Sequence, residues 1–175
     1  MNFSEKKHNF YSFSVLLVIT ILLLGTSLTA RSQRVDFSGT WKLNGEKTDF
    51  GKLSENSTPI QMTMEQINDS IIIERFSKNR QGETHSYLEK LPFDGKDVEI
   101  MINATKKISS AQWSTDGQTF KEVAKYFNSS APIEFGEYRA NEIWTLSDEG
   151  KTLTIMRVDQ MKSGNYPKKM VYNKQ

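Results

Sequence analysis

The chain has 175 residues, with 23 basic and 21 acidic side chains and no cysteine. This length favours a single domain that is large enough to bury its own core. The lack of cysteine excludes disulfide bonds, thiol catalysis and a lipid anchor on an acylated cysteine. Stability must therefore come from apolar packing and from hydrogen bonds between strands.

The N-terminal segment predicts a secretory signal peptide over residues 1–32. A short basic start is followed by an apolar run over 15–24 and then by small residues up to Ser32. This run is too short for a comfortable membrane span. We expect cleavage between Ala30 and Gln33, with Gln33 as the favoured mature start and a domain over 33–175. The protein is then secreted or periplasmic, without stable membrane insertion; an uncleaved anchor is the alternative.

The charge of the predicted mature domain argues against nucleic acid as a partner. Removing 1–32 takes away three basic residues and one acidic residue, so that 20 of each remain. The domain is formally neutral and has no basic excess with which to attract polyanions or anionic lipid. Nucleic acid is therefore not expected as a partner.

Past Gln33, short segments rich in β-branched and aromatic residues alternate with turn residues. This pattern is typical of strands joined by hairpins. We predict ten strands, over 39–44, 59–66, 70–77, 84–91, 97–102, 107–114, 119–128, 137–147, 151–161 and 168–174.

Consecutive tight hairpins predict an all-β, antiparallel up-and-down β-barrel of about eight to ten strands. The predicted turns contain residues that accept positive φ, such as Asn68-Asp69 and Asp116-Gly117. A sheet of this length tends to curl, and full closure removes its edges. A two-sheet sandwich is the alternative, but it needs more long crossing connections than the sequence contains.

Gly39-Thr40-Trp41 at the head of the first predicted strand resembles the Gly-x-Trp signature of lipocalins. The resemblance extends over about 36–174 through the hairpin layout and the late segment "WTLSDEGKTLTI". It implies that the first strand closes the barrel against the last, with Gly39 and Trp41 as a structural floor. Lipocalins also place an arginine over this tryptophan, and Arg157 is the nearest candidate here.

The resemblance implies a small hydrophobic or amphipathic ligand inside the barrel. Candidate ligand-binding residues are the inward-facing Met62, Met64, Tyr87, Phe120, Tyr126, Trp144 and Arg157. A two-residue turn at Glu149-Gly150 would pair Glu142 with Arg157 inside the barrel, whereas a bulged three-residue turn would shift every contact by one residue. The sequence leaves both registers open.

The sequence offers few groups for catalysis, and we expect no enzymatic activity. Once His8 leaves with the signal peptide, only His85 remains, and we expect it on the surface. One histidine without cysteine cannot build the usual zinc sites, and no phosphate-binding or nucleophile motif is present. We therefore predict no catalytic residue, no metal site and no cofactor.

A packed barrel that binds a protein or a polysaccharide through its loops is the alternative function. The loops over 48–58 and 131–135 carry apolar residues that would suit such contacts. The interior separates the two functions. An apolar void of more than ~300 Å³ would favour a small ligand, and a filled interior would favour the loops.

Overall fold

The computed structural model describes residues 33–52, 55, 58–79, 81–129, 131 and 136–175. Their elements are, in chain order, β1 (Gly39–Leu43), the 3-10 turn η1 (Gly45–Lys47), β2 (Gln61–Ile67), β3 (Ser70–Lys78), β4 (Thr84–Pro92), β5 (Val98–Ile102), β6 (Thr105–Trp113), β7 (Phe120–Phe127), β8 (Glu137–Leu146), β9 (Thr152–Met161) and β10 (Gly164–Lys174).

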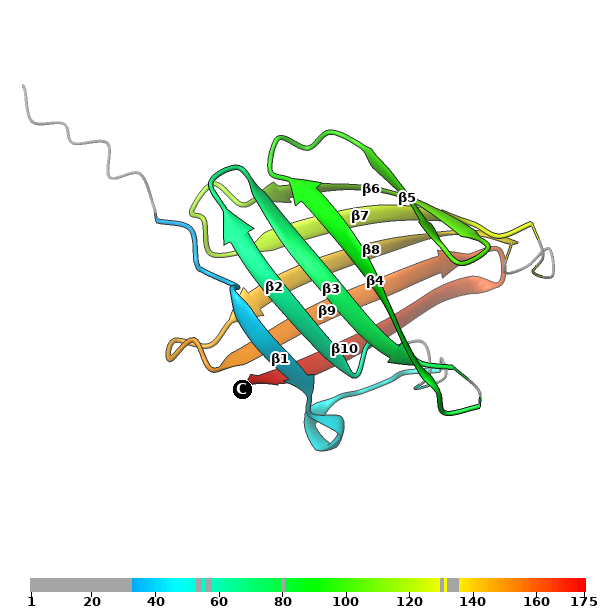
Figure 1. Ribbon diagram of the computed structural model, residues 1–175, viewed down its shortest axis with the longest axis horizontal. Helices are drawn as coiled ribbons and strands as arrows, with labels where there is room; N and C mark the ends of the chain where they lie inside the picture. The colour runs from blue at the N-terminus through cyan, green and yellow to red at the C-terminus, as the bar shows by residue number, and fades with distance from the viewer. Residues whose placement is uncertain (1–32, 53–54, 56–57, 80, 130, 132–135) are drawn as a thin grey trace, which may run out of the picture. The chain divides into compact units, whose positions relative to one another are not determined.

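The ten strands form one antiparallel sheet in the order β4-β3-β2-β1-β10-β9-β8-β7-β6-β5. Every neighbouring pair except β1 and β10 is consecutive in the chain, which is the up-and-down arrangement (Figure 1). The predicted all-β barrel is thus confirmed, and the sandwich alternative is wrong. The hairpins suffice because each strand needs to reach only its sequence neighbour.

The first strand closes the sheet, as the Gly-x-Trp resemblance implied. β1 pairs with β2 on one side, with Trp41 opposite Met62, and with β10 on the other, with Trp41 opposite Lys174. The sheet order ends at β4 and β5, and no ladder joins these two among the described strands. The barrel is therefore nearly closed, with its break between β4 and β5.

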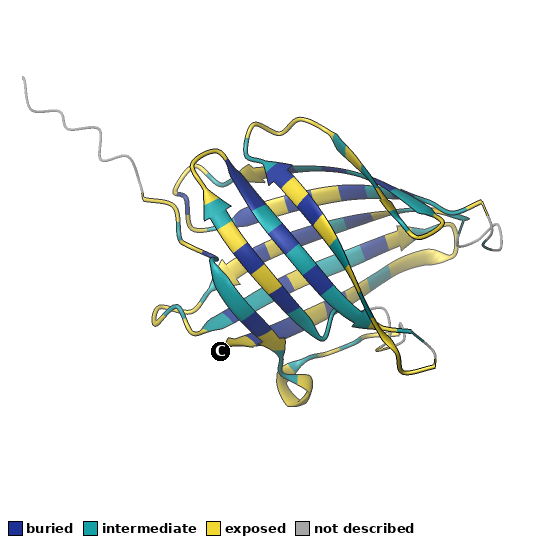
Figure 2. Ribbon diagram, viewed as in Figure 1, coloured by how far each residue is buried: buried dark blue, intermediate teal, exposed yellow. Residues whose placement is uncertain are grey.

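Side chains alternate between the interior and the outer wall, as the pleat requires. In β7, Phe120, Glu122, Ala124 and Tyr126 are buried, and the residues between them are more exposed. Figure 2 shows this alternation as bands along the strands. The interior-facing set includes charged residues, so period-two burial does not separate apolar from polar residues here.

An aromatic cluster fills one end of the barrel. Phe37, which precedes β1, stacks on Trp113 at 5.4 Å between ring centroids and meets Trp144 edge-on at 5.8 Å. The fully buried Trp41 donates from its indole Nε1 to the carbonyl oxygen of Phe37, at 2.8 Å. Phe120 packs against both Trp113 and Trp144. This end is closed by rings, and Trp41 is a structural residue within it.

Two expectations about the last strands are corrected. β10 begins at Gly164 and not at 168, because the turn after β9 lies at 162–163 and Gly164 pairs with Met161. Pro167 fits within β10 because it lies beyond the short β1, where no neighbouring strand needs its missing N–H. The cation over Trp41 is Lys174, whose Nζ lies 5.3 Å from the ring centroid, and not Arg157.

The predicted signal peptide, residues 1–32, lies outside the described residues. Within the part of the chain that the structure describes, no helix is long and apolar enough to span a membrane.

Gly39 is the position where closure of the barrel demands a glycine. Its φ is +126°, and an added Cβ would lie 2.8 Å from Cε of Lys174. We predict that Gly39→Ala lowers the free energy of unfolding by about 1–3 kcal/mol, because it adds backbone strain and a steric contact. Urea unfolding measures the change.

Gly45→Ala is the matched control, because Gly45 has an ordinary φ and open space around its Cα. Part of the Gly39→Ala loss should disappear when Lys174 is also replaced by alanine. Equal losses at Gly39 and Gly45 would contradict this account of the closure.

Candidate functional site

A cavity of about 280 Å³ lies at the end of the barrel opposite the aromatic cluster. The last residues of β3, β5 and β7 and the first residues of β4, β6 and β8 lie at this end of the barrel. Its lining residues are Pro59, Arg75, Ser77, His85, Tyr87, Ile102, Thr105, Tyr126, Tyr138 and Arg157. Most of this lining is polar or aromatic, and only Pro59 and Ile102 are aliphatic.

The order of inward-facing residues along single strands explains the position of the cavity. In β3, Ile71 and Ile73 lie in the apolar cluster, Arg75 follows, and Ser77 reaches the cavity. In β4, read from its other end, Leu91 is followed by Glu89 and then by Tyr87. The interior therefore has three layers: an apolar end, a charged middle and the cavity.

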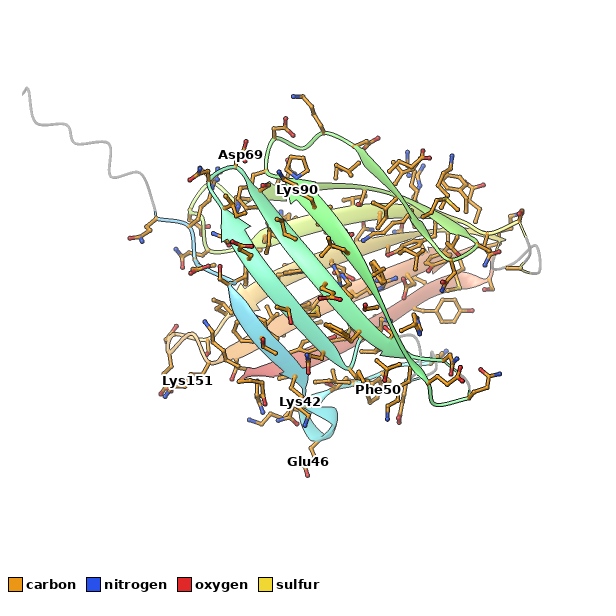
Figure 3. All side chains as sticks on the ribbon, in the orientation of Figure 1. Lys42, Glu46, Phe50, Asp69, Lys90 and Lys151 are labelled. Atoms are coloured by element: carbon orange, nitrogen blue, oxygen red, sulfur yellow. The ribbon has the colours of Figure 1, made fainter. Side chains whose placement is uncertain are left out.

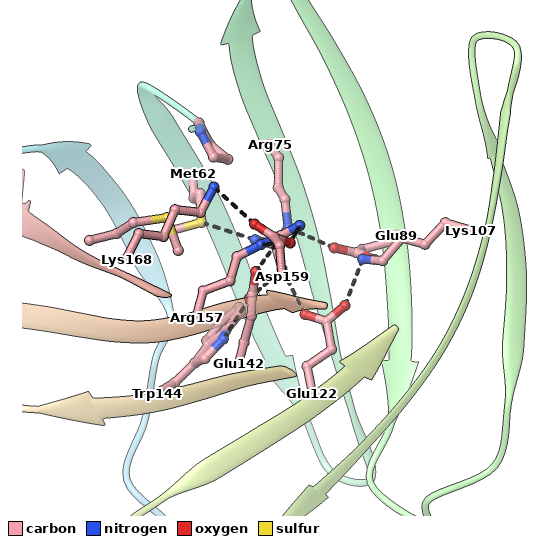
Figure 4. Close-up of polar contacts among 12 residues, drawn as sticks. Met62, Arg75, Glu89, Lys107, Glu122, Glu142, Trp144, Arg157, Asp159 and Lys168 are labelled. Atoms are coloured by element: carbon pink, nitrogen blue, oxygen red, sulfur yellow. Dashed lines mark hydrogen bonds and ion pairs between the residues drawn. The ribbon is translucent and has the colours of Figure 1, made fainter. Parts of the chain in front are cut away.

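The charged middle layer contains four cations and four carboxylates. Seven of them are no more than 3% exposed, and the side chain of Arg157 is 13% exposed. We call this set the ion layer; its members are Arg75, Lys107, Arg157, Lys168, Glu89, Glu122, Glu142 and Asp159 (Figure 4). Their formal charges cancel.

Arg75 connects three carboxylates from three strands. Its Nε donates to Oε1 of Glu89 at 2.7 Å, and its Nη2 donates to Oε2 of Glu122 at 2.8 Å. The same Nη2 lies 3.5 Å from Oε2 of Glu142, and that oxygen accepts a hydrogen bond from the indole of Trp144 at 2.9 Å. Arg75 also lies over the Trp144 ring, 5.2 Å from the centroid. The ion layer is thus anchored to the aromatic cluster.

Lys107 crosses the break in the sheet. Its Nζ, on β6, forms a short ion pair with Glu89 on β4 and lies 2.6 Å from Oε1 of Glu122 on β7. β5 lies between β4 and β6 in the closed order of strands, but it pairs only with β6. This ion pair therefore connects the two sides of the break through the interior.

Arg157 holds two carboxylates at the edge of the cavity. Nη1 lies 2.7 Å from Oε1 of Glu142, and Nε and Nη2 lie 2.8 and 2.7 Å from Oδ1 of Asp159. Lys168 lies 3.7 Å from the other oxygen of Asp159. The Glu142–Arg157 pair settles the register that the sequence left open, since Glu142 faces Arg157 and Trp144 faces Ile155 in the ladder.

Protonation equilibria in the ion layer follow from burial and from the neighbouring charges. Burial disfavours the charge on Glu142, but the attraction of Arg75 and Arg157 outweighs it and holds the pKa of Glu142 well below its usual range. At Glu122, burial together with the nearby carboxylates of Glu89 and Glu142 raises the pKa. Burial, reinforced by the neighbouring charge of Arg157, lowers the pKa of Lys168 to about 8.

Tyrosines form the wall of the cavity above the ion layer. The rings of Tyr126 and Tyr138 stack with centroids 4.6 Å apart and an angle of 6° between their planes. Arg157 lies over the ring of Tyr126, 5.6 Å from its centroid. Burial raises the pKa of Tyr87 and of Tyr138, so both phenols stay uncharged at neutral pH.

The structure separates the seven candidate ligand-binding residues into two groups. Tyr87, Tyr126 and Arg157 line the cavity. The other four lie in the packed apolar cluster and do not line it; they are Met62, Met64, Phe120 and Trp144. His85, expected on the surface, is half-buried and lines the cavity. In β4, His85 lies on the same face as Tyr87 and Glu89. This period-two pattern in the sequence would have placed it inside the barrel.

Sequence reasoning did not identify six members of the ion layer as interior ions. All six occupy inward positions on their strands; they are Arg75, Glu89, Lys107, Glu122, Asp159 and Lys168. Residues two apart in a strand face the same side of the sheet, so a buried apolar neighbour would have placed them inside, as Ile73 does for Arg75 and Leu91 for Glu89. The general rule that charged side chains face water argues against such an assignment.

The interior matches neither of the two extremes that the sequence analysis set out. The cavity approaches the ~300 Å³ expected of a small-ligand site, but its lining is mixed. Figure 3 shows side chains throughout the interior, with Asp69 and Lys151 marking turns at the closed end.

The suspected loops over 48–58 and 131–135 lie partly outside the described residues. Within the described residues, no group of three or more acidic or histidine side chains could hold a metal ion.

Comparison with known proteins places the chain near one solved structure. No family model matches the chain, and no curated protein matches it. The ileal bile acid-binding protein of zebrafish, solved with cholic acid, is similar, with 11% sequence identity and a TM-score of 0.48. The match covers 79% of this chain and 98% of that one.

The pKa of Glu142 is lowered and that of Glu122 is raised, so the two carboxyl groups should contribute differently to the stability of the protein. We predict that Glu142→Gln lowers the free energy of unfolding at pH 7 by about 3–5 kcal/mol, because it leaves Arg157 and Arg75 with an unpaired buried charge. Glu122→Gln should cost clearly less, because the protein already disfavours the ionised form of Glu122. Chemical unfolding of both variants measures the difference.

The pH dependence follows from the lowered pKa of Glu142. A carboxyl with a lowered folded-state pKa stabilises the protein above its unfolded pKa and loses this contribution as the pH falls. The difference between wild type and Glu142→Gln should therefore shrink as the pH drops from about 5 towards 3. A difference that stays constant over this range, or a larger loss for Glu122→Gln, would contradict the assignment.

Proposed function

We propose that the protein binds a small amphipathic molecule in the cavity at the open end of the barrel. The observation that carries this proposal is the lining itself, which combines aromatic rings with the guanidinium of Arg157 and two hydroxyl residues, Ser77 and Thr105. Ligand sites typically combine apolar or aromatic walls with a few polar groups that orient the ligand. The ion layer supports the site by fixing Arg157 through two carboxylates.

We further propose that the protein acts without catalysis, as an exported member of the lipocalin-like barrels. Support for this relationship comes from the closure of β1 against β10, the glycine demanded at position 39 and the cation over Trp41. Support for export comes from the signal-like sequence of residues 1–32. The mixed cavity supports binding, because Glu142 and Asp159 hold Arg157 in place at a wall of aromatic rings.

A second candidate function is contact with another protein or with a polysaccharide. The observation in its favour lies on the outer wall, where Val123, Ile143 and Met156 are 43–47% exposed on three neighbouring strands. Ile143 and Met156 face each other directly in the β8–β9 ladder. Under this alternative, Ile143→Ser would abolish the interaction, whereas changes in the cavity would leave it intact.

Binding in the cavity can be followed at one atom, because His85 lines it. We predict that a small amphipathic ligand shifts the imidazole NMR signal of His85, with His85→Gln providing the assignment. Tyr138→Ala should weaken binding at least about tenfold, since it removes one ring of the stacked wall.

Phe127→Ala is the matched control. Phe127 neighbours Tyr126 in β7 but faces the outer wall, where Lys106 lies over its ring. Its loss should leave binding unchanged. Equal effects of the two substitutions, or binding that does not shift the His85 signal, would exclude the cavity as the site.

Export is tested separately. When the full chain is expressed in a bacterium with an active secretion system, we predict that the exported protein begins at Gln33. N-terminal sequencing and the intact mass distinguish this product from the unprocessed chain of 20.1 kDa. Recovery of only the unprocessed chain would favour the uncleaved anchor.

A further inference from the structure

We propose that the cavity selects uncharged planar aromatic molecules with a hydrogen-bond acceptor, and that it rejects carboxylates and long-chain lipids. This inference rests on the proposed function, since it concerns the same cavity. It follows from three features: the charge balance of the ion layer, the donors that Arg157 still offers, and the shape and composition of the wall.

The charge balance opposes a second carboxylate near Arg157. The cations of the ion layer are matched one to one by carboxylates, and the two nearest to the cavity guanidinium are already in contact with it. A ligand carboxylate would have to displace Glu142 or Asp159, or enter as an extra buried negative charge. Either outcome leaves a buried charge without compensation, which is strongly unfavourable.

Arg157 can still donate to a neutral acceptor. A guanidinium has five N–H groups, and the contacts with Glu142 and Asp159 account for three of them in the described part of the chain. Arg157 is also the most exposed member of the ion layer and lines the cavity. A carbonyl, hydroxyl or ether oxygen can accept from it without disturbing either carboxylate.

The wall favours flat rings over flexible chains. Tyr126 and Tyr138 stack in parallel, and His85 and Tyr87 add two more rings to the lining. Aromatic surfaces favour offset or edge-on contact with another ring. The volume of about 280 Å³ lies at the lower end of small-molecule sites, and the ion layer blocks extension into the barrel. A long acyl chain would have to break the ion layer to be buried.

Three probes test the selectivity on the full chain at pH 7: 2-naphthol, 2-naphthoate and palmitate. The first two share their rings and differ mainly in charge. Titration calorimetry, with the His85 NMR signal as the site-specific readout, should show binding of 2-naphthol, at least tenfold weaker binding of 2-naphthoate, and no binding of palmitate. The Tyr138→Ala variant should lose 2-naphthol affinity, and Phe127→Ala should retain it.

A charge variant tests the cause of the selectivity. Asp159→Asn removes one carboxylate from Arg157 and leaves the ion layer with a net positive charge. It should raise the affinity for 2-naphthoate at least tenfold and change that for 2-naphthol by less than about threefold. Circular dichroism checks that Asp159→Asn is folded. If it is not, Glu142→Gln removes the other carboxylate from Arg157 and should change the two affinities in the same way.

The outcomes separate the two proposals. Tighter binding of 2-naphthoate or palmitate than of 2-naphthol at the His85 site would overturn the selectivity and leave the cavity as a binding site. Binding of none of the probes, or binding unaffected by Tyr138→Ala, would overturn the cavity as a binding site for this class of ligand. Unchanged selectivity in both charge variants would overturn the charge-balance explanation.

Discussion

The contacts of Arg75 determine how the interior of the barrel is arranged. This guanidinium is almost completely buried and reaches carboxylates on β4, β7 and β8. Burying so many charges carries a large desolvation penalty, which the protein offsets by pairing each cation with carboxylates at short range. The members of the network are not equivalent, because the loss of Glu142 leaves two buried guanidinium groups without one of their carboxylate partners, whereas the ionised form of Glu122 is already disfavoured.

This ion layer also explains why the two ends of the barrel differ. Below it, the rings of Phe37, Phe120 and Trp144 pack against one another, with centroids 5.4–6.1 Å apart. Above it, the polar and aromatic side chains leave a cavity of about 280 Å³. The apolar end supplies the burial that a domain without disulfides requires. The open end is then available for binding without loss of that core.

The sequence predicted the fold well and the site only in part. Period-two alternation and turn residues locate all ten strands, and the lipocalin resemblance carried by Gly39 and Trp41 implied the closure of β1 against β10. The register after β8 could not be decided, because Ser-Asp-Glu-Gly-Lys suits two turn lengths. Most of the ion layer was missed for a physical reason: a charged residue at an inward position becomes plausible only when its partners, on strands distant in sequence, are known.

The break between β4 and β5 links the closure of the barrel to the chemistry of the cavity. Lys107 on β6 holds Glu89 on β4 where the hydrogen bonds of a ladder are missing, and Glu89 in turn binds Arg75. Arg75 also lines the cavity, and through Glu142 it is coupled to Arg157. The same charges therefore hold the wall together and form the floor on which a ligand would rest. A ligand carboxylate that displaced Glu142 or Asp159 from Arg157 would weaken the wall as well, which supports the proposal that the site selects neutral molecules.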